Sequence, residues 1–161
     1  MLTLEEIMKR KKYVLDRKPK KIWSLNQLRV GESIIGIPYA EHWKNKKGND
    51  FVLLKLDYGH AICNIYFLIF SYPIQKLLHN NYVNSFELVR FYREANEIPV
   101  DDDITQLHDI NWSDIIDWLN QLQTLKIKVI SKNINGFRNI KFVGMTDNSL
   151  IDFVDFSKYI L

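Results

Sequence analysis

Cysteine is almost absent from this sequence of 161 residues, and it contains no long apolar run. The single cysteine, Cys63, excludes an internal disulfide framework and is typical of a protein in a reducing cytoplasm. The longest apolar run, residues 61–70, is interrupted by Asn64 and is far shorter than the ~20 residues of a membrane-spanning helix. The first residues, MLTLEEIMKRKK, lack the apolar segment of a signal peptide. We therefore expect a cytoplasmic protein without a membrane segment.

Motifs for nucleotide or metal binding are also missing. The sequence contains neither G-x-x-x-x-G-K-[ST] nor G-x-G-x-x-G, the glycine-rich patterns that hold phosphates. Its four histidines are scattered, and one cysteine cannot build a zinc site. No cofactor and no metal are therefore expected. His42 beside Glu41, or His60 near Asp57, could act as a general base in a small metal-independent ribonuclease, which is a third alternative after two non-enzymatic functions.

What the sequence does contain is enough apolar surface for a core and an uneven distribution of charge. Hydrophobic residues make up 47% of the chain, which excludes disorder throughout. The net charge is +3, but residues 1–50 hold 12 basic and 6 acidic residues, whereas residues 51–161 hold 10 and 13. The first part therefore carries +6 and the second −3. This difference favours an acidic partner for the first part of the chain.

The positive charge is concentrated at the end of a predicted helix over residues 2–15. Eight cations fall within thirteen residues, with Asp16 as the one acidic residue among them and with Tyr13 and Trp23 nearby. They are Lys9, Arg10, Lys11, Lys12, Arg17, Lys18, Lys20 and Lys21. Cations with neighbouring aromatic rings can bind a nucleic-acid backbone, releasing counterions and stacking on bases. The alternative is a solvated helix end that its aromatic residues anchor to the body of the protein.

Three predicted strands, over residues 33–39, 51–57 and 61–70, favour a small antiparallel sheet. The third is apolar on both faces and is therefore expected at the centre. Gly36 indicates a bulge in the first strand, and Pro38 places that strand at an edge or ends it. Between the first two strands lies a predicted surface loop, residues 41–50, with a second basic-aromatic patch. This patch consists of Lys44, Lys46 and Lys47 with His42 and Trp43.

The second half of the chain predicts helices followed by a hairpin. Asn84 and Glu87 have the spacing of a capping box that opens a helix. A short helix is expected over residues 105–109, and a longer amphipathic one begins after Asn111, with Asp114 in its first turn. The dipeptide Asn135-Gly136 then indicates a two-residue hairpin turn.

That turn pairs Val129 with Phe142 and Ser131 with Ile140, which puts the apolar residues on one face. The opposite face is basic. It carries Lys126, Lys128, Lys132 and Lys141.

The order of helix, short helix, longer helix and hairpin resembles the winged helix-turn-helix over residues 84–145. The resemblance implies an α+β fold in which a small antiparallel sheet packs with a helical, winged-helix-like C-terminal half. The predicted division is residues 1–72, a basic helix with a β-meander, and residues 73–161, the winged-helix-like region, with one shared core. Nine acidic residues against two arginines between Glu87 and Asp117 depart from the DNA-binding pattern of this family. No base-contacting residues are therefore carried over.

Two functions follow from these observations. The first is a non-enzymatic nucleic-acid-binding protein of a phage or mobile element, whose N-terminal cations and hairpin contact DNA or RNA phosphates. The hairpin residues are Lys126, Lys128, Lys132, Arg138 and Lys141. The second is a phage-type inhibitor that contacts a host nucleic-acid-processing protein through an acidic and aromatic surface. Its residues would be Asp101, Asp102, Asp103, Asp114 and Asp117.

Overall fold

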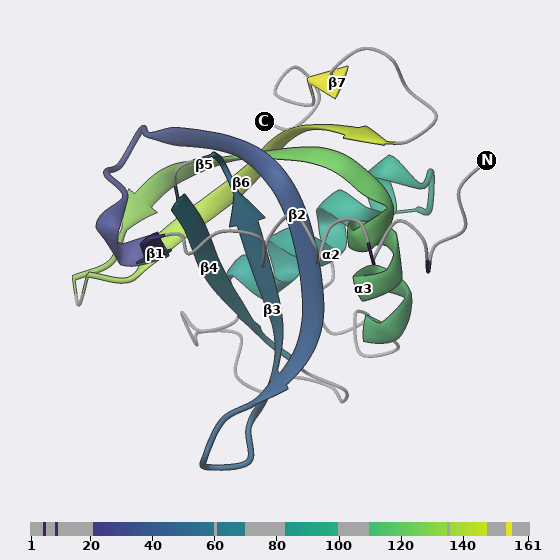
Figure 1. Ribbon diagram of the computed structural model, residues 1–161, viewed down its shortest axis with the longest axis horizontal. Helices are drawn as coiled ribbons and strands as arrows, with labels where there is room; N and C mark the ends of the chain where they lie inside the picture. Colours follow the sequence, from purple (N-terminus) through teal and green to yellow (C-terminus); the bar gives the residue numbers. More distant parts are fainter. Residues whose placement is uncertain are drawn as a thin grey trace.

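The computed structural model describes residues 5, 9, 21–59, 61–69, 83–99, 110–134, 136–147 and 154–155. Within these residues seven strands form one sheet in the order β1-β4-β3-β2-β5-β6-β7 (Figure 1). The strands are β1 (Lys21–Ser24), β2 (Ser33–Lys44), β3 (Asp50–Asp57), β4 (Ala61–Leu68), β5 (Leu122–Lys132), β6 (Arg138–Asp147) and β7 (Val154–Asp155). The helices are the 3-10 helix η1 (Leu25–Gln27), α2 (Val83–Ala95) and α3 (Trp112–Gln121). The sheet is mixed, because β1 pairs parallel with β4 while the other pairs are antiparallel.

The long strand β2 joins the two parts of the sheet, and Figure 1 shows it arching from one part to the other. Its first residues, Ser33–Gly36, pair with β5, and the rest, from Ile37 to Lys44, pairs with β3. The change of partner falls at Gly36. A Cβ atom on this residue would lie 2.3 Å from the backbone oxygen of Asp57, at the end of β3. Glycine is therefore needed here because β3 ends against the backbone of β2.

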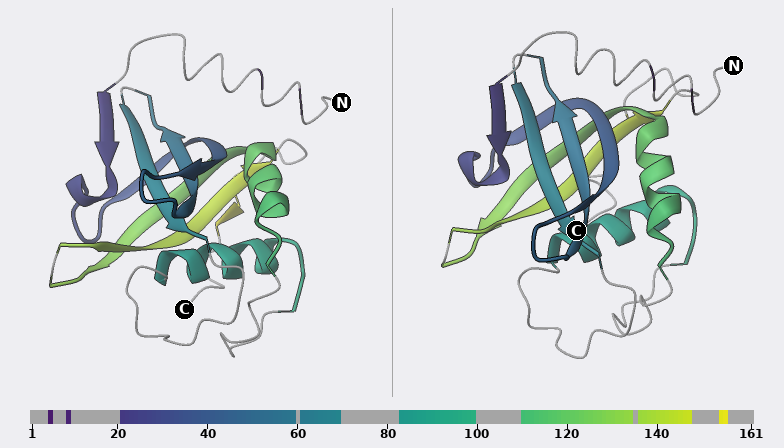
Figure 2. Two further views of the ribbon diagram at one scale, coloured as in Figure 1. Left: turned by 90° about the horizontal axis from the view of Figure 1, so that it is seen from below. Right: turned by 60° about the horizontal axis from the view of Figure 1, so that its bottom comes forward.

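The core lies between the two parts of the sheet, which Figure 2 shows running in different directions. Phe67 of β4 stacks on Phe142 of β6, with ring centroids 6.0 Å apart. Phe142 in turn stacks on Phe91 of α2 at 4.7 Å. All three rings are fully buried. Buried residues of both parts of the sheet and of both helices belong to this one hydrophobic cluster.

The predicted fold class and the winged-helix resemblance are wrong. The strand that forms one arm of the predicted wing, β5, lies inside the seven-stranded sheet, with β2 on one side and β6 on the other. A wing would have one free side. The C-terminal half therefore supplies β5, β6 and β7 to one large mixed sheet in addition to α2 and α3, and is not a helical unit beside a small antiparallel sheet. The physical reason is that the apolar face of β5 and β6 is long enough to complete the core together with β2 and β4.

Two local predictions also need correction. The hairpin does not close with a two-residue turn, because Lys132 pairs with Arg138 and Asn133 N–H bonds to Phe137 O. A bulge follows, so Val129 lies opposite Ile140, not Phe142. The capping-box interpretation of Asn84 and Glu87 is wrong as well. Both residues lie inside α2, where their side chains accept backbone hydrogen bonds from β6.

Several predicted segments fall outside the described residues. Of the predicted helix over residues 2–15, Glu5 and Lys9 are described, and both are helical. The predicted short helix over residues 105–109 lies outside the described part. No described helix combines the length and the apolar character required to cross a membrane.

Candidate nucleic-acid interface

The first group of predicted cations lies at the N-terminus, and the structure describes only two of its members. Lys9 is exposed and lies 3.7 Å from the carboxylate of Glu5, one helical turn earlier. Lys21 opens β1, and its ammonium group lies 5.2 Å from the ring centre of Trp23. The remaining members of the group lie outside the described residues. They are Arg10, Lys11, Lys12, Arg17, Lys18 and Lys20.

The second group, on β5, forms a basic row. Lys126, Lys128 and Lys132 all lie on the outer face of the strand, opposite the buried Ile127 and Val129. Since residues two positions apart in a strand are separated by about 6.6 Å, Lys126 and Lys128 are neighbours along this face. None of the three lysines forms an ion pair with a residue that the structure describes.

The apolar surface beside this basic row is also open to solvent. Ile35 of β2 lies opposite Lys126, and Ile130 lies between Lys128 and Lys132 in β5. Both isoleucines are about half exposed. We call Lys126, Lys128 and Lys132 the β5 lysine row. Its geometry offers several cations in a line, which can neutralise successive phosphates of a nucleic-acid strand.

The two predicted cations on β6 are engaged within the protein. The Arg138 guanidinium donates from Nε to Leu28 O at 3.0 Å and from Nη1 to Gly136 O. Arg138 thus ties the hairpin to the segment that follows η1. Lys141 lies near the carboxylate of Glu87 in α2. Arg138 and Lys141 therefore differ from the β5 lysine row, which forms no ion pair with a described residue.

Glu87 is a buried carboxylate of this region whose protonation the fold changes. Burial raises the pKa of Glu87 above its ordinary value of 4.5. The positive charges of Lys141 and Arg90 and a hydrogen bond from the backbone of Phe142 oppose this effect, and the charge of Glu94 adds to it. The net pKa is raised, so desolvation outweighs the nearby cations.

The predicted acidic surface is only partly described. Asp114 and Asp117 are both exposed on α3, as expected for an interaction surface. Asp101, Asp102 and Asp103 lie outside the described residues. The N-cap prediction for this helix is confirmed, because the side chain of Asn111 accepts a hydrogen bond from the Asp114 backbone at 3.3 Å.

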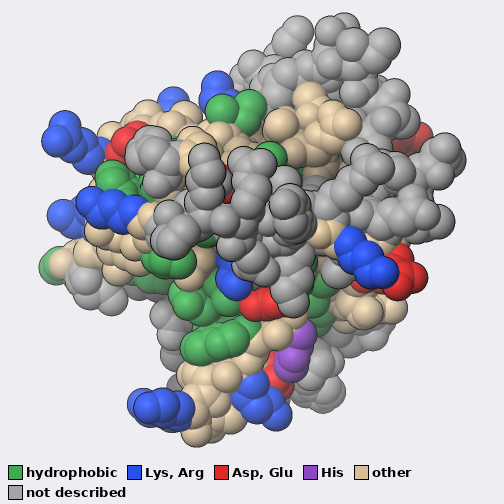
Figure 3. Space-filling view, viewed as in Figure 1, with side chains coloured by type: hydrophobic (Ala, Val, Ile, Leu, Met, Phe, Trp, Pro, Cys, Tyr) green, Lys and Arg blue, Asp and Glu red, His purple; other side chains and the backbone are tan. Residues whose placement is uncertain are grey.

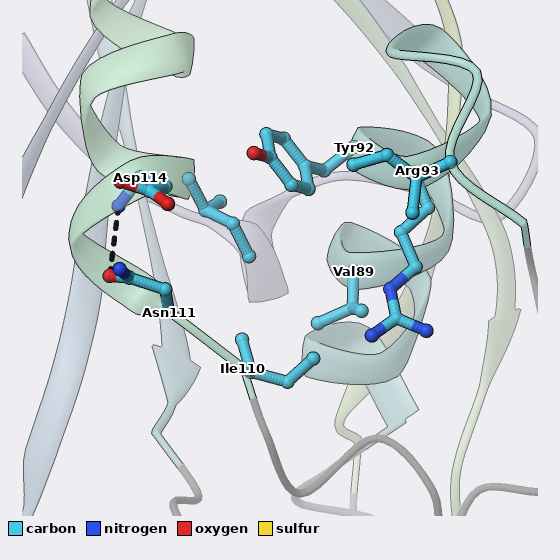
Figure 4. Close-up of a pocket in the computed structure, with 8 residues that line it drawn as sticks. Val89, Tyr92, Arg93, Ile110, Asn111 and Asp114 are labelled. Atoms are coloured by element: carbon cyan, nitrogen blue, oxygen red, sulfur yellow. Dashed lines mark hydrogen bonds between the residues drawn. The ribbon is translucent and has the colours of Figure 1, made fainter.

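A small pocket of about 180 Å³ lies between α2 and α3 (Figure 4). Arg93 of α2 and Asp114 of α3 stand on opposite sides of it. Most of its wall is apolar, formed by Val89, Ile98, Ile110 and Ile115. The described residues contain no group of three His, Cys, Asp or Glu side chains that could hold a metal ion. The pocket is thus a mainly apolar gap between the two helices, with Arg93 and Asp114 at its sides.

The end of the β2–β3 hairpin brings together residues whose positions the sequence predicted only in part. Residues 41–44 were predicted in a loop, but they continue β2, which brings Trp43 onto the outer face of the sheet. There Trp43 contacts Phe51 of β3 and Tyr66 of β4. No signal in the sequence would have identified Tyr66 as a neighbour of Trp43.

No protein-family model matches the chain, and no curated protein is similar to it by sequence.

Proposed function

We propose that this protein is a non-enzymatic nucleic-acid-binding protein that contacts the phosphate backbone. The observation that carries the proposal is the β5 lysine row, with no ion pair between it and the described residues. Lysines that are not neutralised within the protein repel one another and attract a polyanion. Binding to phosphates releases condensed counterions, which gives affinity without base recognition. The predicted N-terminal cations, of which Lys9 and Lys21 are described, would add positive charge that attracts the same kind of partner.

Two features of the chain support a cytoplasmic protein of a phage or mobile element. The buried lone thiol of Cys63 is typical of a cytoplasmic protein. The sequence is rich in asparagine, isoleucine and lysine, a composition that suits an AT-rich phage or mobile element. A backbone-binding protein of this kind would recognise DNA or RNA with little sequence preference.

The test is a fluorescence-anisotropy titration of labelled DNA and RNA at several salt concentrations. Replacing Lys126, Lys128 and Lys132 by glutamine should weaken binding. It should also lower the slope of log K against log salt by about 2, since each lost phosphate contact removes about 0.7–0.9. The matched control replaces three other cations, Arg29, Lys55 and Arg93, by glutamine. This control removes the same net charge from residues outside the β5 lysine row. It should therefore change the affinity and the salt dependence less than replacement of the β5 lysine row does.

A salt-independent affinity, or equal effects of the two triple variants, would overturn the proposal. Cleavage of the RNA without added metal would instead favour the ribonuclease alternative. In that case His42 is the residue to replace, because its Nε2 lies 3.1 Å from a carboxylate oxygen of Asp50.

The inhibitor function is the competing proposal, and the exposed carboxylates of Asp114 and Asp117 support it. It expects no affinity for nucleic acid. It also expects a stable complex with a purified nucleic-acid-processing enzyme that these two aspartates are needed to form. Replacement of both by asparagine would leave nucleic-acid binding unchanged under the first proposal and abolish the complex under the second.

A further inference from the structure

Three aromatic side chains gather on the outer face of the sheet at the end of the β2–β3 hairpin. We call Trp43, Phe51 and Tyr66 the hairpin aromatic cluster. The ring centres of Trp43 and Phe51 are 5.6 Å apart, those of Trp43 and Tyr66 are 5.0 Å apart, and those of Phe51 and Tyr66 are 6.2 Å apart. Each residue comes from a different strand, so the tertiary fold creates the cluster.

The pairing of the strands explains this arrangement. Trp43 lies directly opposite Phe51, and Tyr66 lies opposite Leu53, two residues further along β3. Diagonal neighbours of this kind are within reach of aromatic side chains. The opposite face of the same strands is core, where Val52 and Phe67 are completely buried. The cluster is therefore held by a rigid sheet and faces outward.

The cluster remains substantially open to solvent, which an ordinary packing role does not explain. Trp43 is 36% exposed and Tyr66 is 42% exposed. Large aromatic rings gathered on one surface often mark an interaction site. Figure 3 shows hydrophobic surface at this end of the molecule, bordered by lysine or arginine side chains and a histidine.

The surrounding charge indicates what the partner carries. Three lysines lie on or next to the hairpin, and Lys46 and Lys47 are exposed without an ion pair to any described residue. Lys44 lies 3.9 Å from Asp50, so that one lysine is partly compensated. Aromatic faces beside uncompensated lysines fit a partner that has both flat rings and negative charge.

The loop that presents these lysines is held by its own hydrogen bonds. Asn45 N–H donates to Asn49 O at 3.0 Å, and Gly48 N–H donates to Asn45 O at 3.0 Å. The side chain of Asn45 also accepts from Asn49 N–H at 2.8 Å. The lysines are thus presented from an ordered turn, which lowers the entropy cost of binding.

We infer that the hairpin aromatic cluster binds single-stranded nucleic acid. Bases would stack on Trp43 and Tyr66, while Lys46 and Lys47 contact the neighbouring phosphates. A duplex keeps its bases stacked on one another and offers this surface only its backbone. The inference rests on the proposed function and adds to it a second contact surface and a preference for unpaired strands.

The experiment compares single-stranded and double-stranded ligands with the whole chain. The probes are fluorescein-labelled oligothymidylate and oligouridylate of about 12 nucleotides, within the usual site sizes of such proteins, and a DNA duplex of equal length. Trp43→Ala and Tyr66→Ala should each weaken binding to both single strands by about 10-fold. The effect on duplex binding should be less than about 2-fold, because stacking on bases does not contribute there.

The matched control is Val30→Ala, which removes apolar surface from a residue that is also about half exposed but lies outside the cluster. It should leave all affinities unchanged. Trp43→Phe keeps an aromatic face and should retain most of the single-strand affinity. If Trp43→Ala does not fold, the single-strand affinity of Trp43→Phe is measured in its place. Loss of that affinity in Trp43→Phe, which keeps an aromatic ring, would contradict stacking.

The result that overturns the inference alone is wild-type affinity in Trp43→Ala and Tyr66→Ala together with weakened binding when the β5 lysine row is replaced. The proposed function would then stand without this second surface. If the wild-type protein binds none of the three ligands, the proposed function and the inference fail together.

Discussion

The side-chain amide of Asn120, near the end of α3, hydrogen-bonds both backbone groups of Ala40 in β2, eighty residues earlier. Ala40 N–H donates to Asn120 Oδ1 at 2.8 Å, and Asn120 Nδ2 donates to Ala40 O at 2.8 Å. In an antiparallel sheet, a residue on a neighbouring strand makes this same pair of bonds. β5 cannot make them, because its pairing with β2 ends at Gly36. One buried amide thus replaces a missing strand neighbour.

Asn84 of α2 does the same at another strand edge. Its Oδ1 accepts from Ile140 N–H at 2.9 Å, and its Nδ2 donates to Arg138 O at 3.0 Å. Both bonds go to β6 at a place where β7 does not pair with it. Each helix therefore covers an open edge of the sheet with one asparagine. This satisfies backbone groups that would otherwise be buried without partners or open to another strand.

Replacing Asn120 by alanine should destabilise the protein strongly. The backbone N–H and C=O of Ala40 would lose their partners in a site from which water is excluded. We expect a loss of about 3 kcal/mol in the free energy of unfolding, since each unsatisfied buried group costs about 1–3 kcal/mol. Urea unfolding followed by circular dichroism measures it.

Asn96→Ala is the matched control for this substitution, because Asn96 is exposed and makes one local bond to Tyr92 O. Its effect should stay within about 0.5 kcal/mol. Asn120→Asp keeps the size of the side chain but cannot donate to Ala40 O, so it should also be destabilising. A neutral Asn120→Ala would show that the two bonds to Ala40 contribute nothing to stability.

Gly36→Ala should destabilise the fold by about 3 kcal/mol or more, because overpacking against a backbone atom cannot be relieved by a side-chain movement. The added Cβ would lie 2.3 Å from Asp57 O. Gly48→Ala is the comparison. Gly48 has a φ of +86° but open space around it, so only the conformational cost of about 1–2 kcal/mol is expected. Thermal or urea unfolding of the two variants distinguishes steric from conformational cost, and equal losses would contradict the close contact at Gly36.

The thiol of Cys63 should be unreactive in the folded protein. Cys63 is completely buried, and burial raises its pKa to about 12. At slightly alkaline pH the thiolate fraction is then on the order of 1,000-fold lower than for a free thiol. Because the chain has one cysteine, Ellman's reagent reports on this site alone. We expect no reaction under native conditions and one equivalent in guanidinium chloride; rapid labelling of the native protein would contradict the burial of Cys63.

The contribution of Glu87 to stability should fall as pH rises above 4.5. The pKa of Glu87 is raised in the folded state, mainly by burial, so above 4.5 the folded protein holds this proton more tightly than the unfolded chain. The contribution is fully present below 4.5 and is lost as pH passes through the raised value. Glu87→Gln should therefore lose less stability than the wild type between acidic and neutral pH.

Urea unfolding of the wild type and of Glu87→Gln at several pH values measures this difference. Glu97→Gln, at an exposed residue just beyond the end of α2, is the control for replacing a glutamate by glutamine. If the Glu87→Gln variant has the same pH dependence as the wild type, the raised pKa of Glu87 is contradicted.

Local features of the fold could be predicted well from the sequence. The strands predicted over residues 51–57 and 61–70 from their apolar runs are confirmed by β3 and β4. The N-cap prediction at Asn111 is confirmed as well. Both signals depend on residues that are close in the chain, so they do not require knowledge of what packs against them.

The candidate site could be predicted only in part. The outward face of the β5 lysine row follows from the two-residue period of a strand. The hairpin aromatic cluster does not, because it needs the register of three strands. The contacts of Asn84 and Glu87 with β6 could not be predicted either. The residue types that cap a helix can also form hydrogen bonds with the edge of a strand.

Periodicity and capping along the chain are enough to predict which positions of β5 turn inward, where α3 begins, and where positive charge accumulates. They do not predict that β2 lies between β3 and β5, that two asparagines replace strand neighbours, or that Trp43 contacts Tyr66, because these relationships arise only when the chain folds. Periodicity and capping act between residues that are close in the chain. The choice of strand partner depends on distant segments that compete for the same backbone groups and the same buried surface.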